Sequence, residues 1–426
     1  MGLGLLGRGV GDAIYLAECA AELIVTDLKS KEELAEPIAR LSGFKNITYT
    51  LGEHKLEDFR GRDVILKAAG VPLDSPYIAE ARKEGTPIRM SADLFAEYAG
   101  IPVVGITGTR GKSTTTHMLA AITKAAGMKT LLGGNIRGVS TLALLNDVTG
   151  EETALLELDS WQLQGFGEAH LSPSLAVFTT FYSDHLNYYK DDLAQYLIDK
   201  ANIFFYQVPG DTLILGSQCS PITIEKFGEA IEADIVIASE KNLPEDWKLA
   251  VPGAHNRYDA ALALAAARAL DISDDISKSA LEAFSGVPGR LEFLRERDGV
   301  KIYNDATATT PEATLAALSA LDPDNKQNIL LVIGGADKGL DMSRMREAIH
   351  AHAKDVFLLA GSGTERIRAD APDKVVFTSL KDAVTAAVAQ AGPGDSILFS
   401  PAFASFGMFK NEYDRSDQFT ALVQGL

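Results

Sequence analysis

Short runs rich in valine, isoleucine and leucine alternate with helical stretches along almost the whole chain. Continuous apolar strands separated by helices are typical of parallel sheets that are covered on both faces. The predicted strands are 23–26, 64–67, 103–107, 154–158, 175–179, 212–215, 302–304, 329–333, 356–359 and 396–399. The sequence therefore predicts an α/β fold, and no internal repeat or low-complexity tract argues for another class.

With 426 residues, the chain is too long for one ordinary hydrophobic core. Two Gly-Pro-rich segments mark possible boundaries. Residues 100–102 follow a predicted helix and precede a strand, and residues 286–289 separate another helix from another strand. We therefore expect three domains, at 1–90, 91–288 and 289–426.

Charge and composition exclude several classes of protein. The formal net charge is −18, and such a surface repels nucleic acid, so no nucleic-acid partner is expected. No apolar run reaches the roughly 18 residues that cross a bilayer, and we expect no membrane insertion. The two cysteines, Cys19 and Cys219, have no metal-ligand spacing and fit a reducing compartment. The N-terminal residues lack a signal-peptide pattern, so the expected location is the cytoplasm.

Residues 105–114 read Gly-Ile-Thr-Gly-Thr-Arg-Gly-Lys-Ser-Thr and connect a predicted strand to a predicted helix. In such a turn, backbone N–H groups and the helix N-terminus cradle phosphate. A lysine at this place reaches the β- and γ-phosphates, and a serine holds Mg²⁺. We therefore predict ATP contacts from the following residues: Gly108, Thr109, Arg110, Gly111, Lys112, Ser113 and Thr114.

The spacing of this loop departs from the general pattern, because Gly105 leaves five residues, rather than four, before Gly111-Lys112. In this form the loop resembles that of the Mur ligases and of their folylpolyglutamate synthase relatives. The resemblance implies an ATP-dependent amide-forming ligase that uses Mg²⁺ at two sites. It also implies a Rossmann-like UDP-binding domain, a central P-loop domain and a C-terminal Rossmann-like domain that binds the amino acid.

Further segments resemble the family's motifs in the family's order. Glu157, within Leu-Glu-Leu-Asp-Ser-Trp-Gln-Leu, resembles a magnesium ligand, and His185, after Asp184, resembles a second one. Lys200 lies 15 residues beyond His185, at the position of the lysine that the family carbamylates. The resemblance thus implies Ser113, Glu157, His185 and Lys200 as metal-site residues, and these with Lys112 as the catalytic set.

Three residues farther along the chain resemble family contacts to ATP: Asn256, Arg290 and Asp305. Asp259 and Thr307 depart from the family pattern, which usually has asparagine and lysine there. Arg110 also stands where the family usually has asparagine. One hypothesis is that Arg110 supplies the positive charge that Thr307 lacks, and the alternative is that Arg110 points to solvent.

The segments around Lys338 and around Ser405-Phe406 resemble those that bind glutamate. A lysine and a hydroxyl suit a small dicarboxylate. By resemblance, D-glutamate is the incoming amino acid and UDP-N-acetylmuramoyl-L-alanine is the acceptor. The partners are then small molecules, and a monomer is expected.

Residues 2–7 read Gly-Leu-Gly-Leu-Leu-Gly, and Asp27 follows 20 residues after Gly7. Alone, this pattern predicts NAD binding or a purely structural turn. The family uses the same turn to hold the UDP of its substrate. That resemblance implies substrate contacts from Leu5, Leu6, Asp27, Lys29, Gly70 and Asn135. The strand expected before this turn is not found, since the sequence begins at Met1, which indicates a late start or a trimmed chain.

Two other functions stay open at this point. The chain could use another amino acid, such as L-glutamate, or a folate-like acceptor, although the Gly-rich N-terminal segment disfavours the latter. It could also be a non-catalytic nucleotide-binding homologue, and Asp259 and Thr307 are the residues in favour of that hypothesis.

Overall fold

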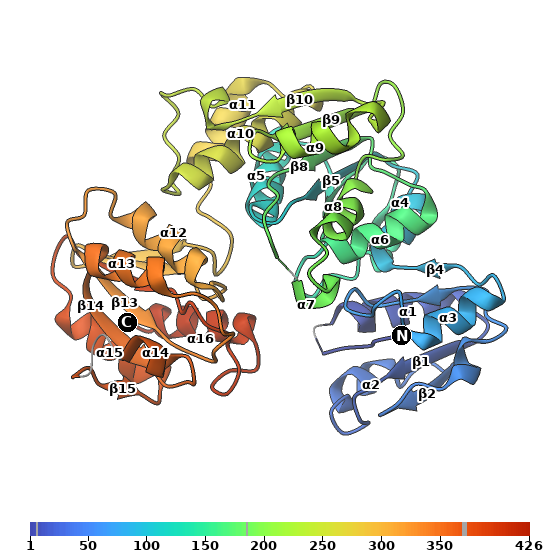
Figure 1. The fold of residues 1–426 in the computed structure, drawn as a ribbon, viewed down its shortest axis with the longest axis horizontal. Helices are drawn as coiled ribbons and strands as arrows, with labels where there is room; N and C mark the ends of the chain where they lie inside the picture. Colours follow the sequence, from blue (N-terminus) through green and yellow to red (C-terminus); the bar gives the residue numbers. More distant parts are fainter. Residues whose placement is uncertain (6, 185, 369–372) are drawn as a thin grey trace. The chain divides into compact units, whose positions relative to one another are not determined.

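The computed structural model describes residues 1–5, 7–184, 186–368 and 373–426 (Figure 1). These residues form two compact units. The first contains Met1–Glu245 and Tyr258–Leu281, and the second contains Asp246–Arg257 and Glu282–Leu426. No helix in the described part of the chain is long and apolar enough to span a bilayer.

The N-terminal part of the first unit contains two short parallel sheets, β1-β2 and β3-β4. Each sheet packs on its own small apolar cluster, one around Val25 and one around Ile65. The elements in chain order are α1 (Arg8–Cys19), β1 (Leu23–Asp27), α2 (Ala35–Leu41), β2 (Ile47–Leu51), η1 (Leu56–Phe59), β3 (Ile65–Leu66), α3 (Pro76–Lys83) and β4 (Ile88–Arg89).

The rest of the first unit is built on a six-stranded parallel sheet with the order β10-β9-β8-β5-β7-β6. Its strands are β5 (Val103–Thr107), β6 (Thr130–Gly134), β7 (Thr153–Glu157), β8 (Leu175–Phe178), β9 (Thr212–Gly216) and β10 (Asp234–Ala238). Its helices are α4 (Ser91–Tyr98), α5 (Lys112–Ala125), η2 (Leu142–Asp147), α6 (Ser160–Ala169), α7 (Leu186–Tyr189), α8 (Leu193–Ala201), α9 (Ser220–Phe227), η3 (Gly228–Ala230), η4 (Glu240–Asn242), α10 (Ala254–Ala269) and α11 (Asp274–Ala283).

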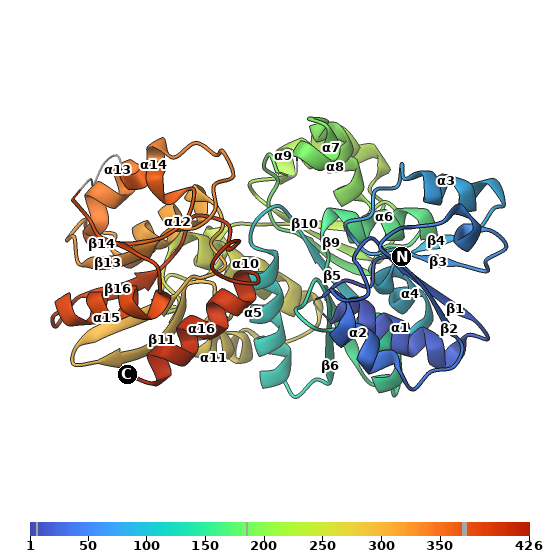
Figure 2. The same cartoon turned by 90° about the horizontal axis from the view of Figure 1, so that it is seen from below.

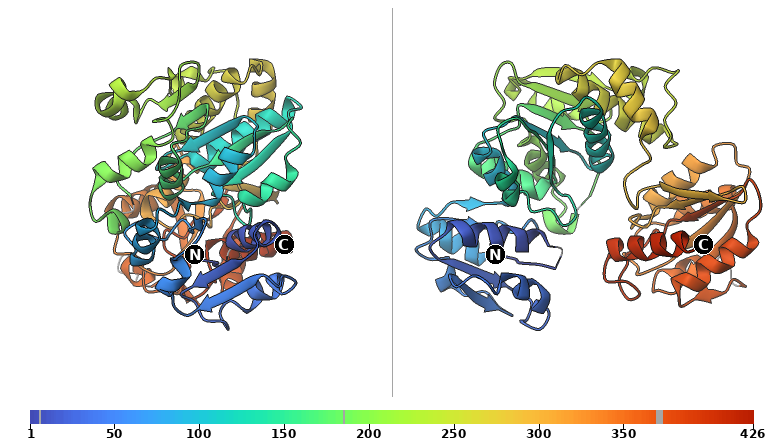
Figure 3. Two further views of the ribbon diagram at one scale, coloured as in Figure 1. Left: turned by 90° about the vertical axis from the view of Figure 1, so that its right-hand side faces the viewer. Right: turned by 180° about the vertical axis from the view of Figure 1, so that it is seen from behind.

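Helices cover both faces of this sheet. Apolar side chains of α4, α6 and α8 form one core with the central strands, and α5 runs along the opposite face, as the view from behind shows (Figure 3). The four central strands are buried on both faces. This burial explains their continuous apolar sequences.

The second unit contains another six-stranded sheet, with the order β11-β12-β16-β13-β14-β15. Among the described strands of this sheet, β11 alone runs antiparallel to its neighbour, β12, and the other pairs are parallel. One core lies between the sheet and α12 to α14, and a second lies between the sheet and α15 and α16 (Figure 2). The elements are β11 (Glu292–Arg297), β12 (Val300–Asn304), α12 (Pro311–Leu321), β13 (Ile329–Ile333), α13 (Ser343–His352), β14 (Ala353–Leu359), α14 (Thr364–Arg368), β15 (Val376–Phe377), α15 (Leu380–Gln390), β16 (Ser396–Phe399) and α16 (Glu412–Gln424).

The α/β class with parallel sheets is confirmed, and each predicted strand overlaps an observed one. Six observed strands were not predicted: β2, β4, β6, β10, β11 and β15. Each of them lies at the edge of its sheet, and most are short or partly exposed, so they lack the full burial of a central strand. The exception in sequence is β10, which has the apolar run 235–238 but is largely exposed. The division into three domains stays a proposal, because the compact units number two.

Candidate active site

The Gly-rich loop joins the end of β5 to the start of α5, as the sequence predicts. Two of its glycines are required by the backbone and by close neighbours. Gly108 has φ +147°, and a Cβ there would lie 1.9 Å from Oγ1 of Thr179. Gly111 has φ +85°, and a Cβ there would lie 2.4 Å from Oδ1 of Asp259. The loop can therefore keep this shape only with glycine at both positions.

Thr179 and Thr180, directly after β8, hold the Gly-rich loop through hydrogen bonds. The Thr109 N–H donates to the Thr180 carbonyl at 2.7 Å, and the Arg110 N–H donates to Thr180 Oγ1 at 2.9 Å. Thr179 Oγ1 donates to the Arg110 carbonyl at 2.5 Å. Sequence reasoning missed both threonines, whose only signal is their place at the end of a buried strand next to β5.

Two lysines converge on the carbonyl of Gly108. Lys112 Nζ donates to it at 2.9 Å, and Lys200 Nζ donates to it at the same distance. Lys200 is only 1% exposed and lies over the ring of Tyr196, with 4.9 Å between Nζ and the ring centroid. Burial, with the nearby charge of Lys112, holds the pKa of Lys200 well below its usual value. The structure thus brings Lys200 beside Lys112 at the Gly-rich loop.

Arg110, at the tip of the loop, lies largely in solvent. Its side chain is 53% exposed, and Nη1 lies 3.5 Å from Oδ2 of Asp184. A surface ion pair of this kind contributes little to stability. Both the solvent-exposed interpretation and a role toward a bound phosphate agree with this position.

Glu157 ends β7, and its register partner in β5 is Ile106, directly before the loop. The side chain is 2% exposed, and Oε1 accepts from Nδ2 of Asn135 at 3.3 Å. Oδ1 of Asn135 in turn accepts from Nη1 of Arg8 at 2.7 Å. This chain of contacts joins the first turn of α1 to the carboxylate at the phosphate loop. Arg8 was not among the residues that the sequence singled out.

The implied magnesium site can be tested against the chemistry of its residues. Glu157 offers a buried carboxylate beside the phosphate loop, and Ser113 lies in the first turn of α5. Mg²⁺ prefers such oxygen ligands together with phosphate oxygens, so these two residues fit. In the described chain, no group of three or more His, Cys, Asp or Glu residues could hold a metal by itself. His185 lies outside the described residues, and Lys200 would supply an oxygen only after modification.

A buried polar cluster supports the helix that carries Lys200. The carboxylate of Asp199 accepts from Nε2 of Gln164 at 2.7 Å, from the hydroxyl of Tyr189 at 3.0 Å and from Nε2 of Gln195 at 2.7 Å. Lys67, directly after β3, adds to the cluster, since its Nζ lies 3.5 Å from Oε1 of Gln164. The cluster fixes α8, and no motif in the sequence pointed to it.

In the N-terminal Gly-rich turn, Asp27 acts as an internal anchor. Its carboxylate accepts from the N–H of Gly4 and from the N–H of Lys29, both at 2.9 Å, and the side chain is 5% exposed. Leu5 is 53% exposed, and Gly70 is also exposed. Leu6 lies outside the described residues. The turn therefore presents exposed groups around a buried carboxylate.

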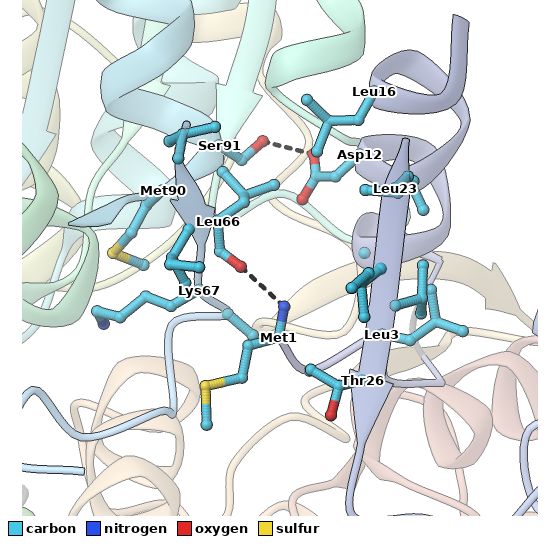
Figure 4. Close-up of a pocket in the computed structure, with 18 of the residues that line it drawn as sticks. Met1, Leu3, Asp12, Leu16, Leu23, Thr26, Leu66, Lys67, Met90 and Ser91 are labelled. Carbon is cyan, nitrogen blue, oxygen red and sulfur yellow. Dashed lines mark hydrogen bonds between the residues drawn. The ribbon is translucent and has the colours of Figure 1, made fainter. Parts of the chain in front are cut away.

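Asp12 connects α1 to the central part of the first unit. Its Oδ1 accepts from Oγ of Ser91 at 2.7 Å and from Oγ of Ser140 at 2.6 Å, and Figure 4 shows the bond to Ser91. The serines lie at the start of α4 and just after the segment of Asn135. These hydrogen bonds hold α1 beside the start of α4 and the segment of Asn135, and no motif in the sequence pointed to them.

In the second unit, Asp305 follows β12 and lies 8% exposed. Its carboxylate accepts from the N–H of Leu291 at 2.9 Å and from Oγ of Ser400 at 2.6 Å. Burial raises the pKa of Asp305 to about 7. A buried carboxyl with a raised pKa is a candidate functional group, and we treat Asp305 as one.

The segment that carries Arg290 is held by Thr307, whose Oγ1 donates to the carbonyl of Gly289 at 2.8 Å. The side chain of Arg290 itself is exposed. Thr307 stands where the resemblance leads us to expect lysine, and its hydroxyl is used for this bond to the backbone. Asn256, at the start of α10, is buried and donates to the carbonyl of Pro252 at 2.6 Å.

The two segments expected to bind glutamate are neighbours. Ala336 and Ala404 exchange backbone hydrogen bonds of 2.9 and 3.1 Å, which places the loops of Lys338 and Ser405 side by side after β13 and β16. Lys338 and Phe406 are exposed, whereas Ser405 is 3% exposed.

Arg415, on α16, is fully buried beneath these loops. Its guanidinium donates to the carbonyl of Ala306 at 2.7 and 3.0 Å and to that of Phe403 at 3.0 Å. It thereby ties the segment after Asp305 to the segment before Ser405.

Two family models match the chain. Residues 106–267 match "Mur ligase middle domain", and residues 289–403 match "Mur ligase, glutamate ligase domain". Among curated relatives, the UDP-N-acetylmuramoylalanine--D-glutamate ligase of Roseiflexus sp. (strain RS-1) is 35% identical over 460 residues, covering 100% of this chain and 97% of the relative. The ligase of the same name from Borreliella burgdorferi (strain ZS7) is 35% identical over 448 residues, with the same coverage.

Solved structures of the same fold are more distant in sequence. UDP-N-acetylmuramate-alanine ligase MurC from Thermotoga maritima gives a TM-score of 0.62 at 18% identity, over 100% of this chain and 98% of the other. E. coli FolC, in complex with DHPP and ADP, gives 0.61 at 17% identity, over 87% of this chain and 96% of the other.

Proposed function

The chain belongs to the Mur ligase family, and we propose that it is the ATP-dependent ligase that joins D-glutamate to UDP-N-acetylmuramoyl-L-alanine. The observation that carries this proposal is the identity of 35%, along the full length, to relatives named for that reaction. The product would be a precursor of peptidoglycan. Because the reaction consumes ATP, we also propose a cytoplasmic location. We also propose that the protein acts as a monomer.

In the proposed reaction, a carboxylate oxygen of the acceptor's alanine attacks the γ-phosphorus of ATP. The bond from that phosphorus to the β,γ-bridging oxygen breaks, so an acyl phosphate forms and ADP is released. The amine of D-glutamate then attacks the acyl carbon, inorganic phosphate leaves, and the amine proton passes to solvent. Catalysis of this kind depends on positioning and on neutralising charge. The proposed roles below follow that requirement.

The phosphates of ATP would lie in the loop of residues 108–114, with Lys112 on the β- and γ-phosphates. Its present partners are loop carbonyls at 2.9 and 3.3 Å, which a bound phosphate would replace. Asn256, Arg290 and Asp305 are proposed as further ATP contacts. Bound Mg²⁺ would neutralise phosphate charge, held by Ser113, Glu157, His185 and a modified Lys200.

We further propose that Lys200 is carbamylated: its amine nitrogen bonds to the carbon of CO₂, and a proton leaves. Lys200 is 1% exposed and contacts the carbonyl of Gly108, so the new carboxylate would lie at the phosphate loop. An anionic oxygen there would suit a cation, whereas the unmodified amine cannot ligate one while it is protonated.

The acceptor would occupy the N-terminal turn, with Leu5, Leu6, Asp27, Lys29 and Gly70 toward the uridine. Asn135 would meet its muramoyl part. Asn135 already contacts both Arg8 and Glu157, which links the acceptor region to the phosphate loop. D-Glutamate would bind between the neighbouring loops of Lys338 and of Ser405-Phe406, where a lysine and a hydroxyl meet its carboxylates.

The test is to measure release of ADP and phosphate with each substrate omitted in turn. We expect release only with ATP, Mg²⁺, the UDP-linked acceptor and D-glutamate together, with L-glutamate inactive. Equal turnover with L-glutamate would replace the proposed specificity with the alternative amino acid. No turnover with any acceptor would favour a non-catalytic nucleotide-binding protein.

The role of Lys200 has its own test. Lys200→Ala should lose nearly all activity and regain part of it with added short carboxylic acids, which can occupy the vacated space. Lys190→Ala is the matched control, because that lysine is 79% exposed and pairs with Asp74 at the surface. Full activity of Lys200→Ala would exclude the carbamylated lysine from the mechanism.

A further inference from the structure

The turn that carries Lys338 is held at both ends by one arginine. Arg366, on α14, donates from Nη1 to Oδ1 of Asp337 at 2.8 Å and from Nη2 to the carbonyl of Leu340 at 2.7 Å. Asp337 and Leu340 stand on either side of Lys338-Gly339 in the sequence. A planar guanidinium, with several donors in a fixed arrangement, suits two acceptors at once. Arg366 therefore closes the turn across both of its ends.

Two further hydrogen bonds order the same turn. The Gly339 N–H donates to Oδ1 of Asp337, and the Asp337 N–H donates to Oγ of Ser362, both at 3.0 Å. Gly339 has φ +71°, a left-handed conformation that suits glycine. The bond from Arg366 lowers the pKa of Asp337, so its carboxylate is ionised at neutral pH. Hydrogen bonds to an ionised acceptor are stronger than those between neutral groups.

The backbone of Arg366 is itself fixed by the second unit. Its N–H donates to the carbonyl of Gly363 at 3.1 Å. Its carbonyl accepts from Nη2 of Arg346, on α13. The neighbouring side chains of Thr364 and Ile367 are buried. The guanidinium therefore ties the turn to a well-packed part of the fold.

The segment before α14 contacts both loops of the expected glutamate site. The Gly363 N–H donates to the carbonyl of Gly335 at 2.9 Å, in the loop of Lys338. On its other side, a Cβ at Gly363 would lie 2.3 Å from the ring of Phe403, in the loop of Ser405. Direct packing therefore sets the position of α14 relative to both loops.

Folding stability is a weak reason for this arrangement. The side chains of Arg366 and Asp337 are 34% and 32% exposed, and an ion pair at such a place contributes little to stability. The bonds instead remove conformational freedom that a ligand would otherwise have to remove when it binds. A lysine on an ordered turn meets a carboxylate at one position, whereas a lysine on a loose loop meets it at several.

We propose that Arg366 is a positioning residue that sets the chain length of the amino-acid substrate, because it fixes Lys338 at a constant separation from Ser405. This inference rests on the proposed function, since it takes Lys338 and Ser405 as the groups that meet the two carboxylates of glutamate. With the separation fixed, a dicarboxylate that is one methylene shorter or longer cannot reach both groups equally well. Arg366 acts through Lys338 and does not touch the substrate.

The test compares Arg366→Leu and Arg366→Lys with the wild type, using D-glutamate, D-aspartate and the homologue one methylene longer than glutamate. Arg366→Leu should raise the KM for D-glutamate about tenfold and change the KM for ATP by less than about twofold. The ratio of kcat/KM for D-glutamate to that for each other acid should fall about tenfold. Arg366→Lys keeps the charge without the paired donors and should give intermediate values.

A control variant and a second measurement separate this role from support of the fold. Arg368 lies on the same helix and its side chain is 46% exposed, so Arg368→Leu should match the wild type. In Arg366→Leu, hydrogen exchange at the Gly339 amide should become about tenfold faster, while exchange at Leu331, in the buried strand β13, should not change.

Three results would overturn the role of Arg366. If Lys338→Ala raises the KM for glutamate but Arg366→Leu changes neither that KM nor the selectivity, Arg366 is no positioning residue while the proposed function stands. If the KM for ATP rises equally, or exchange also becomes faster at Leu331, Arg366 supports only the fold. If the wild type shows no ADP release that depends on D-glutamate, the proposed function fails, and this inference fails with it.

Discussion

Replacing Asp305 by asparagine should change how the stability of the protein depends on pH. In the fold, the carboxyl is 8% exposed and its pKa rises from the ordinary 3.8 to about 7, mainly because of burial. Asparagine has nearly the same shape, cannot ionise, and can still accept from the N–H of Leu291. The variant therefore isolates the effect of the charge.

The sign follows from the two pKa values. Because the folded pKa lies above the unfolded one, the folded state holds the proton more tightly. The stabilisation is complete below the unfolded pKa and is lost as pH rises through the folded pKa. The full difference corresponds to about 4 kcal/mol, of which about 3 kcal/mol is lost between roughly pH 5 and pH 8. The wild type loses this amount, and Asp305→Asn does not.

Calorimetric melting of both proteins from pH 5 to pH 8 measures the difference. We expect the melting temperature of Asp305→Asn, relative to the wild type, to rise by about 5 to 10 °C across this range. Asp298→Asn is a control, because that side chain is 87% exposed. A difference between Asp305→Asn and wild type that stays constant with pH would refute the reasoning, since it would mean that Asp305 is ionised throughout.

Three further predictions concern activity. Gly108→Ala should weaken nucleotide binding, measured by titration calorimetry, by about 100-fold or more. The added methyl group would lie 1.9 Å from the hydroxyl oxygen of Thr179. Gly43→Ala is the control and should bind nucleotide normally, because a Cβ there has no neighbour within 4 Å. Lys338→Ala should raise the KM for glutamate about tenfold or more while the KM for ATP stays unchanged, and equal increases in both would remove Lys338 from the glutamate site. Arg110→Asn should lower kcat about tenfold, and adding Thr307→Lys should restore much of it; effects that simply add would mean that the two positions act independently.

The amino-acid sequence by itself determined the class of fold and the position of the phosphate loop. Both depend on local patterns: buried parallel strands carry continuous apolar runs, and a phosphate turn needs glycines followed by Lys112 and Ser113. The order of motifs from Glu157 to Ser405 also indicated the family, which the family models and the full-length relatives confirm.

Only the tertiary structure decided which distant groups meet. Lys200 contacts Gly108 across 92 positions of the chain, and Arg8 contacts Asn135 across 127. Such contacts leave no local period in the sequence, because they arise only when the strands pack in a particular order and bring the ends of distant segments to one edge.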